Sequence, residues 1–257
     1  MNEPDVQLDP AALPEEPPRP VSDVPWRVAD AVFVLGLWLV TATIVGGLAL
    51  VALAQVVSDR LAEALSLPIT MVAMLGVVLL YVQRRYPGNV RRLFGPARPT
   101  WTLLGLGLGA GVVAFLVFGL GLGLLLDLLI RAVRGVTPTV QESFREIARD
   151  PSNAPLLVFG AVFIAPLAEE LCFRGLLFSA LRKWLPLWPA MGLSGLAFGL
   201  THIQTTLDGY LLVVVIIMPL GMFLAYVYER SRTLVVPIAA HAVFNLVQVV
   251  LLIRNPG

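Results

Sequence analysis

The feature that most constrains this chain is a group of three charged side chains inside a long apolar segment. Glu169, Glu170 and Arg174 lie within residues 156–181, a stretch long enough to span a bilayer as a helix. A charged side chain at the centre of a bilayer costs at least about 2.5–3.5 kcal/mol on insertion scales. These three groups must therefore pair with one another inside a bundle or take part in chemistry.

Helical spacing separates the three charges into two roles. Glu170 and Arg174 are four residues apart with the glutamate first, the order that favours an ion pair along one helix face. Glu169 lies about 100° round the helix from Glu170. We interpret Glu170 and Arg174 as a structural pair, and Glu169 as a carboxylate that faces elsewhere. The alternative is a purely structural cluster of three charges that holds helices together.

The composition indicates a membrane protein. Of the 257 residues, 58% are hydrophobic and 14% are charged, whereas soluble domains are nearer half apolar and a quarter charged. The net charge of +1 argues against a nucleic-acid partner. The apolar segments predict an all-α, polytopic transmembrane helix bundle of about seven spans in the lipid bilayer of the cell (inner) membrane, near residues 28–57, 65–82, 101–126, 156–181, 187–206, 210–228 and 234–253.

The two ends of the chain and its loops predict an orientation. Residues 1–25 hold seven prolines and six acidic side chains, which is typical of a disordered tail, and residues 26–257 then form the transmembrane domain. Residues 83–99 form the most basic loop, with five arginines. The positive-inside rule places this loop and the N-terminus in the cytoplasm, with eleven basic residues inside against six outside.

Two further patterns predict local structure. The third span holds glycines four residues apart, a spacing that lets helices approach closely: Gly105/Gly109, Gly107/Gly111 and Gly119/Gly123. Residues 140–148 are either a short amphipathic helix at the membrane interface or a solvated loop.

The polar residues of the C-terminal half predict a shared cavity. His202 and His241 are the two histidines of the chain, and both fall in apolar segments; His241 shares a helix face with Asn245. A lone histidine in an apolar helix is usually a packing residue. Four such groups, counting Glu169, favour one polar pocket within the membrane.

This set of side chains suits hydrolysis of a peptide bond without a covalent intermediate. Glu169 could act as a general base that takes a proton from water. Asn245 and one histidine could donate hydrogen bonds to the oxyanion, while the other histidine orients the water or protonates the leaving amine. Two histidines and a glutamate are also a catalytic zinc set, but the compact His-Glu-x-x-His helix is absent. We therefore expect no cofactor, with zinc as the less favoured alternative.

Three motifs resemble a known family. Glu169-Glu170-Leu171-Cys172-Phe173-Arg174, Phe198-xxx-His202 and His241-xxx-Asn245 are similar to the signature of the CPBP intramembrane proteases, a family that includes type II CAAX prenyl endopeptidases and bacterial Abi or bacteriocin-processing proteins. The resemblance covers roughly residues 155–250. It implies a substrate that is a membrane-associated or lipidated protein or peptide. It also implies the following roles: Glu169 activates water, Glu170 and Arg174 support the site, Phe198 and His202 form the second motif, and Asn245 beside His241 stabilises the oxyanion.

Two rival functions use the same residues. In a proton-coupled transporter, the glutamate and histidines would form a relay through the bundle. Such a carrier should show inverted repeats, and the two halves of this chain show no self-similarity. The other rival is a non-catalytic membrane scaffold of the same fold, of the immunity type that protects against a peptide toxin.

Overall fold

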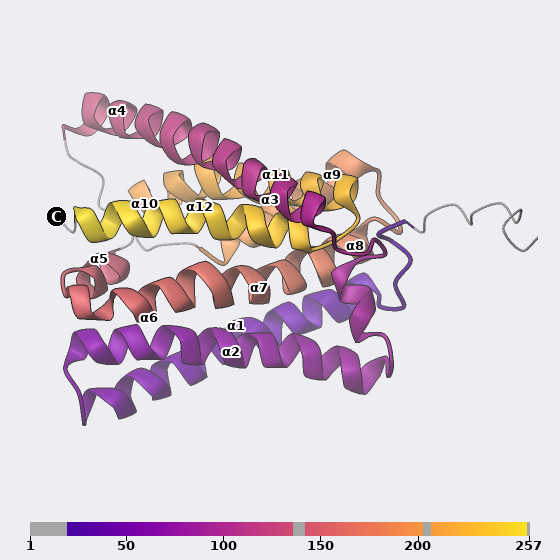
Figure 1. The fold of residues 1–257 in the computed structure, drawn as a ribbon, viewed down its shortest axis with the longest axis horizontal. Coiled ribbons are helices and arrows are strands. Elements are labelled where there is room, and N and C mark those ends of the chain that lie inside the picture. Colours follow the sequence, from indigo (N-terminus) through magenta and orange to yellow (C-terminus); the bar gives the residue numbers. More distant parts are fainter. Residues whose placement is uncertain (1–19, 136–141, 203–206, 256–257) are drawn as a thin grey trace, which may run out of the picture.

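The computed structural model describes residues 20–135, 142–202 and 207–255. In these ranges the regular structure is entirely helical, and the long helices run side by side (Figure 1). Six helical segments are long and apolar enough to cross a membrane: Val28–Ala54, Asp59–Arg85, Trp101–Val133, Pro151–Leu181, Gly209–Ser231 and Val235–Arg254. A shorter apolar helix, Leu187–Leu200, brings the described set close to the expected seven. The prediction of a polytopic helical bundle is confirmed.

The first two spans form a pair of adjacent helices, α1 (Val28–Ala54) and α2 (Asp59–Arg85). The expected start of the second span at residue 65 was wrong. The side chain of Ser58 accepts a hydrogen bond from the Leu61 amide, so Ser58 is the N-cap of α2. The helix therefore begins at Asp59, six residues before the expected start. At the other end of the pair, Asp30 accepts hydrogen bonds from the hydroxyls of Tyr81 (2.6 Å) and Tyr86 (2.7 Å). Burial and the hydrogen bond to Asp30 raise the pKa of Tyr86.

The third span is one long helix that runs past its expected end at residue 126. It consists of α3 (Trp101–Ala114), the π-helical segment η3 (Phe115–Leu122) and α4 (Gly123–Arg134). Only some of its glycines meet another helix. A Cβ on Gly107 would lie 2.8 Å from the carbonyl oxygen of Val236, whereas Gly105 and Gly109 have nothing within 4 Å. The predicted close approach is therefore borne out for Gly107/Gly111 against α12 and is wrong for Gly105/Gly109.

The fourth span carries the charged cluster and lies deep in the bundle. After the short helix α5 (Glu142–Ala148), it is built from consecutive segments: η4 (Pro151–Asn153), α6 (Ala154–Val158), η5 (Phe159–Ile164), α7 (Ala165–Glu170), η6 (Leu171–Phe178) and α8 (Ser179–Leu181). Hydrogen bonds from Ser152 to the Asp150 carboxylate start the span and hold the pKa of Asp150 below its usual range. Residues 142–148 are helical, as expected if residues 140–148 form a short helix and not a loop. Residues 140 and 141 lie outside the described residues.

The last part of the chain contains α9 (Leu187–Leu200), α10 (Leu207–Leu212), η7 (Val213–Ile217), α11 (Met218–Ser231) and α12 (Val235–Arg254). The helix expected over 187–206 ends at Leu200, and residues 203–206 lie outside the described part of the chain. His202 therefore stands just beyond the C-terminus of a 14-residue helix and not within a full span.

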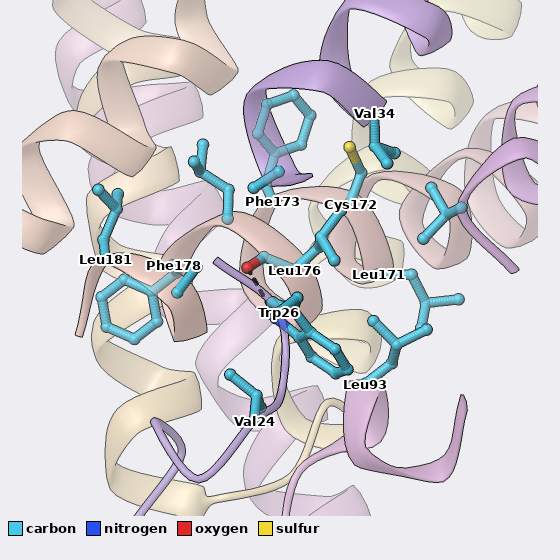
Figure 2. Packing of buried hydrophobic residues seen from close by; sticks show 14 of the residues in the cluster. Val24, Trp26, Val34, Leu93, Leu171, Cys172, Phe173, Leu176, Phe178 and Leu181 are labelled. Carbon is cyan, nitrogen blue, oxygen red and sulfur yellow. Dashed lines mark hydrogen bonds between the residues drawn. The ribbon is translucent and has the colours of Figure 1, made fainter. Parts of the chain in front are cut away.

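The end of the bundle that carries the basic loop is tightly closed. Trp26 is fully buried and donates its indole N–H to the Leu176 carbonyl (3.1 Å) and to the Ser179 hydroxyl (3.0 Å). Figure 2 shows Trp26 packed close to Leu93 and Leu176. Lys183 donates to the backbone carbonyls of Val24 and Trp26. Residues 20–25 are therefore packed against the bundle, which corrects the expected tail boundary at residue 25; residues 1–19 lie outside the described ranges.

The opposite end of the bundle carries α5. Arg60, in the first turn of α2, lies 3.8 Å from the Glu146 carboxylate of α5. Figure 1 shows α4, α5 and the C-terminal end of α12 together at this end, while α8 and the described N-terminal segment lie at the other. The two ends are called here the α5 face and the basic face.

Candidate active site

A cavity of about 370 Å³ lies between the helices of the C-terminal half and the α1–α2 pair. Its polar lining includes Glu169 from α7, His202 from the end of α9, and His241 with Asn245 from α12. The rest of the wall is mainly apolar, with side chains from α1 and α2 among others. The structure thus brings the four proposed catalytic residues to one cavity, although they come from three separate parts of the sequence.

Glu170 lies behind this cavity in a buried ion pair. Its Oε1 lies 2.8 Å from Nη1 of Arg174, and both side chains are fully buried. Nη2 of Arg174 donates to the Gly221 carbonyl of α11 at 2.9 Å. The guanidinium also stands over the Phe198 ring, 4.6 Å from its centroid, which adds a cation–π contact. The pairing expected from the four-residue spacing is present.

His241 connects the buried pair to the cavity. Its Nδ1 lies 3.0 Å from Oε1 of Glu170, and its Nε2 lies 3.7 Å from Oε2 of Glu169. Nδ1 donates its hydrogen bond to the carboxylate of Glu170, and the other ring nitrogen, Nε2, faces Glu169. The distance of 3.7 Å is too long for a direct hydrogen bond but suits a bridging water.

Asn245 is oriented by a backbone carbonyl. Its Nδ2 donates to the Ala161 carbonyl oxygen at 2.8 Å, which leaves the second N–H of the amide uncommitted by that bond. Ala161 belongs to the π-helical segment η5, in which a carbonyl bonds to the amide five residues later. That residue is Pro166, which has no N–H. The Ala161 carbonyl is thus available to hold the side chain of Asn245.

His202 and Phe198 complete the site. Nδ1 of His202 lies 2.9 Å from the Phe198 carbonyl, and because a carbonyl only accepts, Nδ1 donates in this hydrogen bond. The Phe198 ring touches both imidazoles, with centroids 4.7 Å from His202 and 5.7 Å from His241. Phe198 is fully buried and fixes the relative placement of the two histidines.

The metal alternative does not fit this arrangement. Within the described residues, no three His, Cys, Asp or Glu side chains are grouped so that they could hold a metal ion. We therefore derive no step through a metal.

Sequence reasoning missed several parts of the site. Gln248 lines the cavity three residues after Asn245 and seven after His241, so helical periodicity could have found it. Trp38, Met71 and Phe144 also line the cavity. The sequence around each of them is typical of an apolar span or a loop and gives no sign of a functional role. Nothing in the sequence identifies the Ala161 and Gly221 carbonyls as partners of Asn245 and Arg174.

The fold is that of a multi-pass membrane protein, and the residues of the three motifs line one cavity in its C-terminal half. Residues 151–247 match the family model "Type II CAAX prenyl endopeptidase Rce1-like". This match confirms the family resemblance that the three motifs indicate.

Two further comparisons bear on the family. A protein of Bacillus subtilis (strain 168) named "Putative membrane peptidase YdiL" is 25% identical over 128 residues, which cover 46% of this chain and 50% of that protein. The match thus spans about half the length of this curated relative. No solved structure matches the chain. At the level of family, these comparisons indicate a membrane protease.

Proposed function

We propose that this protein is an intramembrane endopeptidase that hydrolyses a peptide bond in a membrane-associated or lipidated protein or peptide. The observation that carries the proposal is the convergence of Glu169, His202, His241 and Asn245 on one cavity inside the bundle. The family match over residues 151–247 supports the same class of reaction.

In this proposal, Glu169 and His241 activate a water molecule. We take His241 as a neutral imidazole with its proton on Nδ1, so that its Nε2 and the facing Oε2 of Glu169, 3.7 Å apart, both accept hydrogen bonds. A water about 2.8 Å from each can donate one hydrogen to either group. Its lone pairs then point away from both bases and toward a substrate carbonyl. Glu169 takes the proton as the oxygen attacks, which is general base catalysis.

Asn245 is proposed to stabilise the oxyanion that this attack creates. The hydrogen bond from Nδ2 to the Ala161 carbonyl fixes the orientation of the amide. The second N–H therefore needs little reorganisation to donate to the substrate oxygen as negative charge develops on it. The tetrahedral intermediate then collapses, the C–N bond breaks, and the leaving nitrogen takes the proton from Glu169. The products are a carboxylic acid and an amine, and His202 lies at the same cavity to orient the water or the leaving group.

A proton relay across the membrane is less well supported than hydrolysis. A transporter needs a path that reaches both faces in turn. Here the side chains on the basic side of the cavity are fully buried, including Arg174, Phe178 and Tyr228. We therefore keep hydrolysis as the proposed function.

The decisive experiment replaces the proposed base. Membrane peptides from a deletion strain carrying the wild-type protein, Glu169→Gln or Asp127→Asn are compared by mass spectrometry. We expect Glu169→Gln to accumulate in the membrane but to lose cleavage by roughly 10²–10⁴-fold, as expected for loss of a general base. Asp127, on the third span, lies in none of the proposed machinery, so its variant should cleave like the wild type. Full cleavage by Glu169→Gln would contradict the proposal.

A second assay, with the purified protein and a membrane peptide identified by the first, tests the metal question. We expect cleavage by the purified protein to survive treatment with a strong zinc chelator, because the proposed chemistry uses only Glu169, the two histidines and Asn245. Loss of cleavage that added zinc restores would overturn this part of the mechanism.

A further inference from the structure

Among the described residues, those that line the cavity extend from the four polar residues toward the α5 face. In α12 the lining residues begin at His241 and continue through Gln248 and Leu252, two residues before the helix ends at Arg254. In the fourth span they are Ala161, Ala165 and Glu169, and no residue of this span after Glu169 lines the cavity. Both helices thus present their α5-face halves to it.

The basic side of the site is sealed. Directly beyond Glu169 and His241 lie Arg174, Phe173 and Phe178, all fully buried. Trp26 and Leu93, also fully buried, pack behind them (Figure 2). A peptide could reach Glu169 from this side only if that core came apart.

The α5 side offers a lined path. Phe144 of α5 belongs to the cavity wall, together with Val249 and Leu252 near the end of α12. The stripe from His241 to Leu252 rises about 16 Å. An extended peptide advances about 3.3 Å per residue, so this stripe can accompany about five substrate residues.

Gln248 is the polar group along this path. It is half-buried, lines the cavity and makes no hydrogen bond among the described residues. An amide presents a donor and an acceptor together, which matches the N–H and C=O of an extended peptide. The amide is partly exposed at the cavity wall, so it can exchange water for the backbone of a bound peptide.

We propose, building on the proposed function, that the peptide substrate reaches Glu169 from the α5 face, that this face is the non-cytoplasmic side of the membrane, and that Gln248 binds the substrate backbone on the way. The sidedness follows from charge. The basic face carries the arginine-rich loop 83–99 with Lys183 and Arg232, and cytoplasmic loops hold the excess of Lys and Arg. The substrate is therefore a peptide segment exposed to, or already moved to, the far side of the membrane.

Thiol labelling tests this route without any known substrate. The one native cysteine, Cys172, is 2% exposed and should contribute little background. Gln248→Cys, Leu246→Cys and Gln83→Cys variants are exposed to a charged, membrane-impermeant methanethiosulfonate, in intact cells and in inside-out vesicles. Leu246 lies on the outer surface of the same helix, and Gln83 is exposed at the basic face.

We expect the Gln248→Cys variant to react in intact cells and the Gln83→Cys variant only in inside-out vesicles. The Leu246→Cys variant should react at least about tenfold more slowly, because a thiol in apolar surroundings forms little thiolate. Leu252→Cys provides a second reporter nearer the α5 face and should react from the same side as Gln248→Cys. Reaction of both cavity variants only in inside-out vesicles, or of neither under both conditions, would overturn the inference.

The outcome is separable from that of the proposed function. Labelling does not depend on catalysis, so Glu169→Gln combined with Gln248→Cys should react as fast as Gln248→Cys alone. Correct labelling with no cleavage by the wild type would refute the protease alone. Cleavage with labelling from the basic face would refute the route alone. For the role of Gln248 itself, Gln248→Leu should raise KM more than it lowers kcat.

Discussion

At the scale of single residues, a buried ion pair holds the proposed site in place. Glu170 binds both Arg174 and Nδ1 of His241, and Arg174 reaches the Gly221 carbonyl of a different helix. Taking two charges out of water is expensive, and the cost is offset only by good geometry and further hydrogen bonds. The pair thus acts as a positioning element for His241, while Glu169 one residue earlier faces the cavity.

Removing one partner of this pair should be severely destabilising. In Arg174→Leu, Glu170 stays buried with its main counter-charge gone, so we expect a loss of about 3–5 kcal/mol in the free energy of unfolding. Arg174→Lys should not restore stability fully, since the single ammonium of lysine cannot reproduce the two separate guanidinium donors that bond to Glu170 and to the Gly221 carbonyl. Thermal unfolding in detergent micelles measures both. An Arg174→Leu variant as stable as the wild type would show that the pair is not structural.

Asn245 gives a prediction about rate. In Asn245→Asp the donor to the Ala161 carbonyl becomes an acceptor, so the side chain loses that anchor and cannot stabilise an oxyanion. We expect cleavage to fall by about 10²–10³-fold, the usual effect of losing one oxyanion donor. The peptide assay for Glu169→Gln measures this, and near wild-type cleavage would remove Asn245 from the mechanism.

At the scale of helices, irregular segments put the functional groups where they are needed. The π-helical segment η5 leaves the Ala161 carbonyl for Asn245, and the early end of α9 places His202 at a helix terminus. Close helix contacts bring the remaining partners together. A Cβ on Gly195 of α9 would lie 2.8 Å from the Met218 carbonyl of α11, so the helix bearing Phe198 can approach the helix bearing Gly221.

Two glycines two residues apart on α3 provide a matched test of helix contact. A Cβ on Gly111 would lie 2.6 Å from the Ala240 carbonyl oxygen, whereas Gly109 has nothing within 4 Å. We expect Gly111→Ala to destabilise the protein by about 1–3 kcal/mol through overpacking. Gly109→Ala should be neutral or stabilising by up to about 1 kcal/mol, because alanine favours the helix. Unfolding in detergent checks the difference, and equal stabilities would contradict the described packing of α3 on α12.

At the scale of the whole molecule, the bundle is sealed at the basic face and hollow toward the α5 face. The segment before α1 contributes to the seal, since Trp26 packs into the core around η6 and Lys183 binds its backbone. The N-terminal and C-terminal halves are thus joined at the face opposite to the proposed entry route. In the described part of the chain, the cavity lining therefore continues toward the α5 face and not toward the basic face.

The seal predicts which tryptophan matters for stability. Trp26 is fully buried, whereas Trp101 is 88% exposed at the start of α3. Trp26→Ala should cost about 3–5 kcal/mol, the usual range for a fully buried aromatic side chain. Trp101→Ala in the same detergent should change the unfolding midpoint little. If both variants unfold alike, the segment at residues 20–26 does not hold the core as described.

The sequence alone determined the class of fold and the identity of the polar residues. Long apolar segments specify membrane helices because unpaired backbone groups cannot lie in lipid. The Glu170–Arg174 pair followed from local helix geometry, which depends only on a four-residue spacing. The same reasoning failed at helix limits, such as the start of α2 and the end of α9, and at Gly105/Gly109, because caps and neighbouring helices decide those features.

Only the tertiary structure decided how the polar residues meet. Residues 169, 202 and 241 are far apart in the sequence, and their common cavity depends on helix tilt, helix ends and close contacts that no local pattern encodes. The hydrogen bond from His241 to Glu170, the Ala161 carbonyl behind Asn245 and the open α5 face are of this kind. They arise from packing between segments, whereas periodicity reports only on neighbours along one helix.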